Sequence, residues 1–172
     1  MTALRTVLVV TLLGLILSCA AQAQEHMVFL VRHAEKAVEP AADPPLSTQG
    51  LLRAESLAIR IANAKPSAIY TSQYQRTQMT ANPLARAVGI GITVVPIDKA
   101  SAGDYPQLLR MRICAQPAGS NAVIIGHSNT IPTIAAAWTA QSVRPIAEDE
   151  YNRILIIKFK DCHAVEWLDL RY

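Results

Sequence analysis

The chain has 172 residues, a formal net charge of +3 and 51% hydrophobic residues. A chain of this length is typical of a single catalytic domain with its own core. The small net charge excludes the strongly basic surface that nucleic acids and anionic membranes attract. We therefore expect no nucleic-acid partner and no stable membrane partner for the folded domain.

The N-terminus has the pattern of a secretory signal peptide. Arg5 precedes an apolar run over residues 7–17, which is shorter than the roughly 20 residues of a membrane-spanning helix. The small residues Ala21-Gln22-Ala23 then fit the A-x-A cleavage pattern. We predict a signal peptide over residues 1–23, cut after Ala23, and an exported domain over residues 24–172 in the periplasmic or extracellular space.

The same segment has two alternative interpretations. In the first interpretation, the segment is an uncleaved anchor or an N-terminal core helix. In the second it is a lipoprotein signal, because Cys19 follows Ile16-Leu17-Ser18. A lipidated Cys19 would tether the domain to a membrane.

The first half of the domain alternates short apolar runs with helical stripes. The run MVFLV ends abruptly at Arg32-His33, which is typical of a buried strand. Ser47 has the position of a helix N-cap, and Pro83 is expected to kink or interrupt its helix. In chain order we predict a strand over 27–31, a helix from Ser47 to Lys65-Pro66, a strand over 68–71, a helix over 75–88 closed by Gly89, and a strand over 92–97.

The second half continues the alternation and then changes to two strands. Pro132 falls in the first turn of a predicted helix, where proline is tolerated. We predict a helix over 105–114, a strand over 122–125, a helix over 130–140, and strands over 153–159 and 164–170 joined by a turn.

Strands that alternate with helices predict an α/β fold, a three-layer sandwich with a mostly parallel central sheet flanked by helices. Ligands of such sheets bind beyond the carboxyl ends of the strands. Three polar segments follow predicted strands: Arg32-His33, residues 72–76 and residues 126–128. We expect them to meet at one edge of the sheet.

These segments carry the groups that phosphoryl transfer requires. A phosphate is anionic, and the planar guanidinium of arginine can bind two of its oxygens. A neutral imidazole can attack phosphorus, and neighbouring arginines help to keep it neutral. A carboxylic acid can protonate the leaving group. The candidates are Arg32, His33 and Glu35 in the first segment, Arg76 in the second, and His127 and Ser128 in the third; no step requires a metal or another cofactor.

Four motifs in series resemble those of one family. Val31 to Glu35 resembles an R-H-G-E signature, and Leu46 to Gly50 is similar to L-S-x-x-G. Tyr70 to Thr77 resembles an S-x-x-x-R-[AT] segment, and Val123 to Ser128 resembles V-x-G-H. Together they resemble the histidine phosphatase superfamily, also called phosphoglycerate mutase-like.

The resemblance implies roles for these residues and a class of substrate. His33 takes the phosphoryl group, while Arg32, Arg76 and His127 surround its oxygens. The short length resembles the compact branch with phosphohistidine phosphatases and exported lipopolysaccharide-core heptose phosphatases. A phosphatase acting on a small phosphomonoester or phosphoramidate is therefore expected, with a mutase-like phosphoryl transferase as the alternative.

The sequence departs from the family pattern at two positions. Ala34 replaces the usual glycine, which is tolerated if the backbone there is not left-handed. Ser128 stands where the acid-phosphatase branch has an aspartate, and it is a candidate to bind phosphate or to cap the following helix. The general acid is therefore open among Glu35, Asp104 and Asp43.

Two other functions are weighed against this one. A serine hydrolase would use Ser128, with Asp149 and His163 following in hydrolase order. That alternative leaves Arg32-His33 and Arg76 without a role. A non-catalytic phosphate-binding module is the other.

Two further features stay open. Cys114 and Cys162 either form a disulfide, which export permits, or are two buried small side chains. Substrate specificity is expected from the loops 39–45, 98–104 and 141–150.

Overall fold

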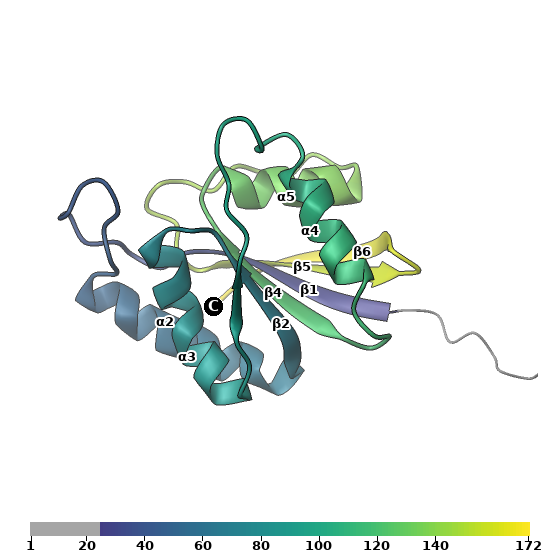
Figure 1. Cartoon of the computed structure of the whole chain (residues 1–172), viewed down its shortest axis with the longest axis horizontal. Helices are drawn as coiled ribbons and strands as arrows, with labels where there is room; N and C mark the ends of the chain where they lie inside the picture. Colours follow the sequence, from purple (N-terminus) through teal and green to yellow (C-terminus); the bar gives the residue numbers. More distant parts are fainter. Residues whose placement is uncertain (1–24) are drawn as a thin grey trace, which may run out of the picture.

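The computed structural model describes residues 25–172 (Figure 1). The predicted signal peptide and Cys19 lie outside these residues. Within them, no helix combines the length and the apolar character needed to cross a membrane. The elements in chain order are β1 (Glu25–Arg32), α2 (Thr48–Ile61), the 3₁₀ turn η1 (Ala62–Ala64), β2 (Pro66–Thr71), α3 (Gln75–Val88), β3 (Ile92–Val94), α4 (Tyr105–Cys114), β4 (Asn121–Gly126), α5 (Thr130–Thr139), β5 (Arg153–Lys160) and β6 (His163–Arg171).

The six strands form one sheet in the order β3-β2-β4-β1-β5-β6. Strands β1 to β4 are mutually parallel, and β5 and β6 add an antiparallel extension beside β1. The strand order crosses over between β1 and β2, because β4 lies between them. Such a crossover creates a crevice at the carboxyl ends of the parallel strands, where ligands bind.

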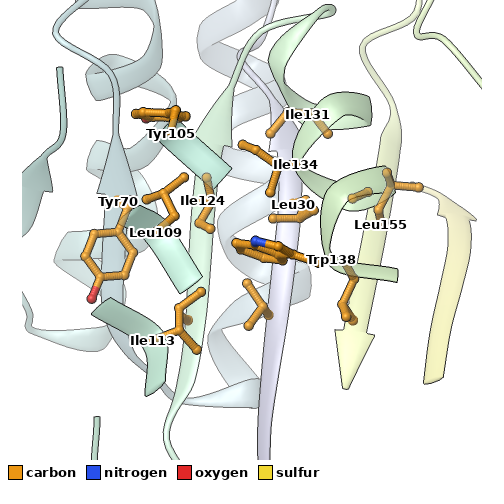
Figure 2. Packing of buried hydrophobic residues seen from close by; sticks show 14 of the residues in the cluster. Leu30, Tyr70, Tyr105, Leu109, Ile113, Ile124, Ile131, Ile134, Trp138 and Leu155 are labelled. Atoms are coloured by element: carbon orange, nitrogen blue, oxygen red, sulfur yellow. The ribbon is translucent and has the colours of Figure 1, made fainter. Parts of the chain in front are cut away.

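Helices cover both faces of the sheet. Helices α2 and α3 lie on one face and α4 and α5 on the other (Figure 1). The core between the sheet and α4/α5 contains Leu30, Ile124, Leu155 and Trp138 (Figure 2). A second core of aliphatic side chains fills the space between the sheet and α2/α3. The predicted three-layer α/β sandwich is confirmed.

Two elements differ from the sequence prediction. Helix α3 is continuous through Pro83, whose ring is buried on the face that packs against the sheet with Ala81 and Leu84. Burial of that face offsets the lost backbone hydrogen bond. Strand β3 ends at Val94 instead of residue 97: Val95 still donates to the Thr71 carbonyl (2.8 Å), but the next residue is a proline without an N–H.

A disulfide joins the end of α4 to the turn between β5 and β6. Cys114 and Cys162 form this bond, with Cα atoms 5.6 Å apart. Arg110 also donates to the Cys162 carbonyl, with its Nε at 3.0 Å. The open question from the sequence is therefore answered in favour of the disulfide.

Candidate active site

The site lies where β1 and β4 end side by side. Arg32 is the last residue of β1 and pairs with Gly126, the last residue of β4. The His33 amide extends this pairing by donating to the Gly126 carbonyl at 2.9 Å. Consequently His33 and His127 emerge next to each other, although 94 positions separate them in the sequence.

The start of α2 holds the segment that carries His33. Ser47 caps this helix by accepting from the Gly50 amide (3.1 Å), and its own amide donates to the Glu35 carbonyl (2.9 Å). A Cβ on Gly50 would lie 2.1 Å from that carbonyl oxygen. Glycine is therefore required for the helix to approach so closely. Ala34 is outside the positive-φ region, so the backbone accepts it in place of glycine.

His33 is buried and its ring orientation is fixed. Its Nδ1 lies 2.7 Å from the Ala34 carbonyl, which can only accept, so Nδ1 carries the proton and Nε2 keeps its lone pair. Burial lowers the pKa of His33 to about 4; the hydrogen bond to the Ala34 carbonyl opposes this effect, and the charges of Arg76 and Arg32 add to it. The imidazole is therefore neutral at neutral pH, as a nucleophile requires.

His127 faces His33, with ring centroids 5.3 Å apart in an edge-on arrangement. The guanidinium of Arg76 lies 3.5 Å from its Nδ1 and can only donate, so Nε2 carries the proton and donates to Ser72 Oγ at 3.0 Å. Burial, followed by the charges of His33 and Arg76, lowers the pKa of His127 to about 3. Both imidazoles are therefore neutral before an anion binds.

The two arginines of the site each stack on a tyrosine ring. Arg76 lies over the Tyr74 ring (4.4 Å) and within 3.5 Å of Asp43 Oδ1. Arg32 is 2% exposed, and its guanidinium lies 4.1 Å over the Tyr151 ring. The Nε of each arginine is buried without a hydrogen-bond partner among the described residues. Both guanidinium groups thus keep donor capacity that the protein does not use.

A pocket of about 440 Å³ opens over these groups. Its lining combines five of the predicted residues, all except Glu35, with part of the loop 98–104 after β3. Among residues 25–172, no three His, Cys, Asp or Glu side chains are grouped so as to hold a metal ion. The lining residues are Arg32, His33, Lys36, Tyr74, Arg76, Ile97, Asp98, Lys99, Ala102, His127, Ser128, Asn129, Thr130 and Glu148.

Glu35 does not line the pocket. Its carboxylate accepts two bonds from Arg53 Nε, both at 2.8 Å, and lies 2.6 Å from Arg53 Nη2. Partial burial alone would raise the pKa of the Glu35 carboxyl, but the hydrogen bonds from Arg53, a backbone hydrogen bond and the charges of Arg53 and Arg32 together lower it. The geometry therefore gives Glu35, one of the three candidate acids, a structural contact with Arg53.

The other sequence candidates have different environments. Asp43 accepts from the Gln75 amide at the start of α3 (3.1 Å), and Asp104 lies at the start of α4, outside the pocket lining. Ser128 does line the pocket. It does not cap α5, because Asn129 occupies the N-cap position, and its hydroxyl donates instead to Glu148 Oε1 at 2.8 Å.

Sequence reasoning missed Tyr74, Lys36, Lys99 and Glu148 in this pocket. Tyr74 lies between two motif residues, and its edge-on contact with His127 (5.4 Å) depends on tertiary packing. Glu148 belongs to a predicted specificity loop, but no motif or period singles it out there.

The serine hydrolase alternative has no geometric basis. Ser128 donates to a carboxylate, whereas His163 pairs with Lys160, which lies opposite Glu25 at the start of β1. His163 therefore sits at the other end of the sheet from Ser128. The catalytic triad of that alternative does not assemble.

One family model matches the part of the chain that carries three of these residues. Residues 28–99 match the family model of the histidine phosphatase superfamily (branch 1), a segment that contains Arg32, His33 and Arg76. Over these residues the chain is similar to the histidine phosphatase superfamily. His127 lies beyond the matched segment and reaches the site through the pairing of β1 with β4. No curated protein sequence matches the chain.

Solved structures share the fold of this chain. A mycobacterial glucosyl-3-phosphoglycerate phosphatase is 14% identical, with a TM-score of 0.69 over 86% of this chain and 98% of its own. The protein histidine phosphatase SixA, complexed with tungstate, is 14% identical, with a TM-score of 0.68 over 84% and 96%. A phosphoserine phosphatase mutant from Entamoeba histolytica, complexed with phosphoserine, is 16% identical, with a TM-score of 0.62 over 81% and 94%. At these identities the likeness establishes the fold.

Proposed function

We propose that the chain hydrolyses a small phosphomonoester or phosphoramidate by passing the phosphoryl group through a covalent phosphohistidine on His33. The match to the histidine phosphatase superfamily and the named phosphatases among the similar structures support a hydrolase of phosphoric esters. The observation that carries the mechanism is the neutral His33 imidazole, with an Nε2 lone pair beside a pocket that Arg32 and Arg76 also line.

In the first step, Nε2 of His33 attacks phosphorus while the bond to the leaving oxygen breaks. The guanidinium groups of Arg32 and Arg76 offset the negative charge of the phosphoryl oxygens. The Nδ1–H of His33 donates to the Ala34 carbonyl and stabilises the positive charge that develops on the ring. Substrate phosphate also favours the protonated form of His127, which then donates from Nδ1 to a phosphoryl oxygen.

In the second step, water attacks the phosphohistidine and the P–N bond breaks. Inorganic phosphate leaves and His33 returns to its neutral form. The protein's own side chains supply the positive charge for both steps, so we expect activity to persist in EDTA.

Hydrolysis of p-nitrophenyl phosphate in EDTA tests this function. We expect the wild type to turn over and His33→Ala to be slower by at least about 10³-fold, because the nucleophile is lost. His163→Ala, at the other end of the sheet, is the matched control and should keep wild-type activity. Full activity of His33→Ala would contradict the assignment of the nucleophile.

The products separate the remaining alternatives. Transfer of the phosphoryl group to a second substrate hydroxyl, instead of release as inorganic phosphate, would identify a mutase-like transferase. Tight binding of phosphoesters, with no hydrolysis of either a phosphoester or a phosphoramidate, would identify a binding module.

We also propose that the domain is exported after cleavage behind Ala23. The disulfide between Cys114 and Cys162 supports export, because such bonds persist in oxidising compartments. N-terminal sequencing of the protein from its native host should begin at Gln24. A lipid-modified Cys19 at the N-terminus would instead favour the lipoprotein alternative.

A further inference from the structure

No carboxylate expected from the sequence is placed to protonate a leaving group. Glu35 is paired with an arginine outside the pocket, Asp43 accepts from the first turn of α3, and Asp104 lies outside the pocket lining. The two carboxylates that do line the pocket are Asp98 and Glu148. One of these two is the better source of the proton.

Asp98 is committed to its own turn. Its Oδ1 accepts from both the amide and the hydroxyl of Ser101, each at 2.8 Å. These hydrogen bonds hold the pKa of the Asp98 carboxyl below its ordinary value. Asp98 is therefore stabilised as an ionised acceptor, which is a poor proton donor.

Glu148 contacts two of the groups that a bound phosphate would need. Its Oε1 accepts from Ser128 Oγ at 2.8 Å, and its Oε2 accepts from Arg32 Nη2 at 3.1 Å. Its side chain is nevertheless 83% exposed. The carboxylate thus lies in the pocket lining, beside Arg32 and Ser128, and is open to solvent on its other side.

The backbone beneath Glu148 is held in place by two buried arginines. Arg32 donates from Nη1 to three carbonyls of residues 147–150, at 2.7, 2.9 and 3.1 Å. Arg153 donates from Nη1 to the carbonyls of residues 144 and 145, at 2.7 and 3.3 Å, while Asp169 accepts its other two donors at 2.9 Å. These bonds therefore hold the loop that carries Glu148 beside the pocket, and acid catalysis requires such a positioned side chain.

We propose that Glu148 is the catalytic acid that protonates the leaving oxygen, an inference that rests on the proposed phosphohistidine mechanism. A substrate phosphate competes for the donors of Arg32 and Ser128 that Glu148 contacts in the empty site, which leaves the Glu148 carboxyl to face the leaving oxygen.

The protons balance over one turnover. As the P–O bond breaks, the electron pair leaves with the substrate oxygen, which takes the proton of Glu148 and departs as the alcohol. When water attacks the phosphohistidine, the Glu148 carboxylate takes one water proton while the hydroxyl binds phosphorus and the P–N bond breaks. The cycle consumes one water and returns Glu148 protonated and His33 neutral, with hydrogen phosphate as product.

The test is Glu148→Gln, with p-nitrophenyl phosphate and phenyl phosphate as substrates of similar shape. A general acid matters most when the leaving group is a poor one, as phenolate is compared with p-nitrophenolate. Because kcat/KM reports the steps up to departure of the leaving group, it isolates the protonation step. We expect kcat/KM for phenyl phosphate to fall about 10²-fold or more, with a fall of less than about tenfold for p-nitrophenyl phosphate.

Two variants serve as controls. Asp149→Asn changes the neighbouring exposed carboxylate, which does not line the pocket, and should keep the wild-type ratio between the two substrates. Glu35→Gln should keep that ratio too, because Glu35 faces Arg53 instead of the pocket.

The outcomes distinguish the acid role of Glu148 from the proposed phosphatase function. Equal losses on both esters in Glu148→Gln, or no loss, would overturn the acid role while leaving the phosphatase in place. If the wild type hydrolyses neither ester, or His33→Ala hydrolyses both as fast, the proposed function fails and the acid role fails with it.

Discussion

At the scale of single residues, the state of the site before substrate binding follows from burial beside positive charge. His33 and His127 are enclosed next to Arg76 and Arg32, and no carboxylate among the described residues accepts from either ring. Both effects disfavour the charged imidazolium. The pocket therefore holds two neutral rings between two guanidinium groups and is ready for an anion.

The low pKa of His33 predicts a loss of stability in acid. In the unfolded chain its pKa returns to 6.5, whereas in the fold it is about 4. Between these values the unfolded chain binds more protons, so the free energy of unfolding falls as the pH falls. From pH 7 to pH 5, His33 should contribute a loss of about 2 kcal/mol.

Urea unfolding of wild type and His33→Ala at pH 7 and pH 5 measures this contribution. The wild type should lose more stability than the variant over this interval. The same loss in both proteins would mean that His33 is not held neutral by its surroundings.

At the scale of elements, the approach of α2 to the segment after β1 positions the nucleophile. Gly50→Ala places a Cβ 2.1 Å from the Glu35 carbonyl oxygen, so helix and segment must separate. We expect a loss of about 1–3 kcal/mol in stability and a lower kcat. Thermal unfolding and turnover of p-nitrophenyl phosphate measure the two effects.

Gly91→Ala is the matched control for Gly50→Ala, because nothing lies within 4 Å of its added Cβ. That variant should stay within about 0.5 kcal/mol of the wild type. A Gly50→Ala protein as stable and as active as Gly91→Ala would show that the close contact does not position His33.

The sequence predicted the helices and strands better than it predicted the site. The spacing of apolar residues and the capping residues predicted each described β-strand and α-helix, because an element that is buried on one or both faces has apolar residues at regular positions. The predicted end of β3 was wrong because the proline after Val95 has no N–H to donate. Helix α3 has the predicted bounds but is not interrupted at Pro83, because burial of its sheet-facing side is a tertiary effect that local propensity does not contain.

Within the candidate site too, some residues could be predicted from the sequence and others could not. Arg32, His33, Arg76 and His127 follow strands and come together as the topology predicts. Glu148 lies in an irregular loop whose course is set by carbonyls bound to Arg32, so no local pattern marks it. An arginine expected to contact only phosphate thus also organises the loop.

At the scale of the whole molecule, the disulfide links two elements that the sheet alone does not join. Cys114 ends α4, and Cys162 lies in the turn between β5 and β6, 48 positions later. Closing a loop of this length should stabilise the fold by about 2–4 kcal/mol. The double variant Cys114→Ser/Cys162→Ser should lose this amount in denaturant unfolding.

Reduction by dithiothreitol provides the control for the disulfide. It should destabilise the wild type to the level of the double variant and leave that variant unchanged. A wild type that reduction does not affect would contradict the contribution of the bond.

The central claim is that His33 becomes phosphorylated during turnover, and one measurement tests it most directly. The enzyme is mixed with p-nitrophenyl phosphate, quenched within the first turnover in alkali, where phosphohistidine survives, and analysed by peptide mass spectrometry. The account predicts a phosphoryl group on the His33 peptide of the wild type and none on His33→Ala. A phosphoryl group on another residue, such as Ser128, or turnover by His33→Ala at the wild-type rate, would contradict it.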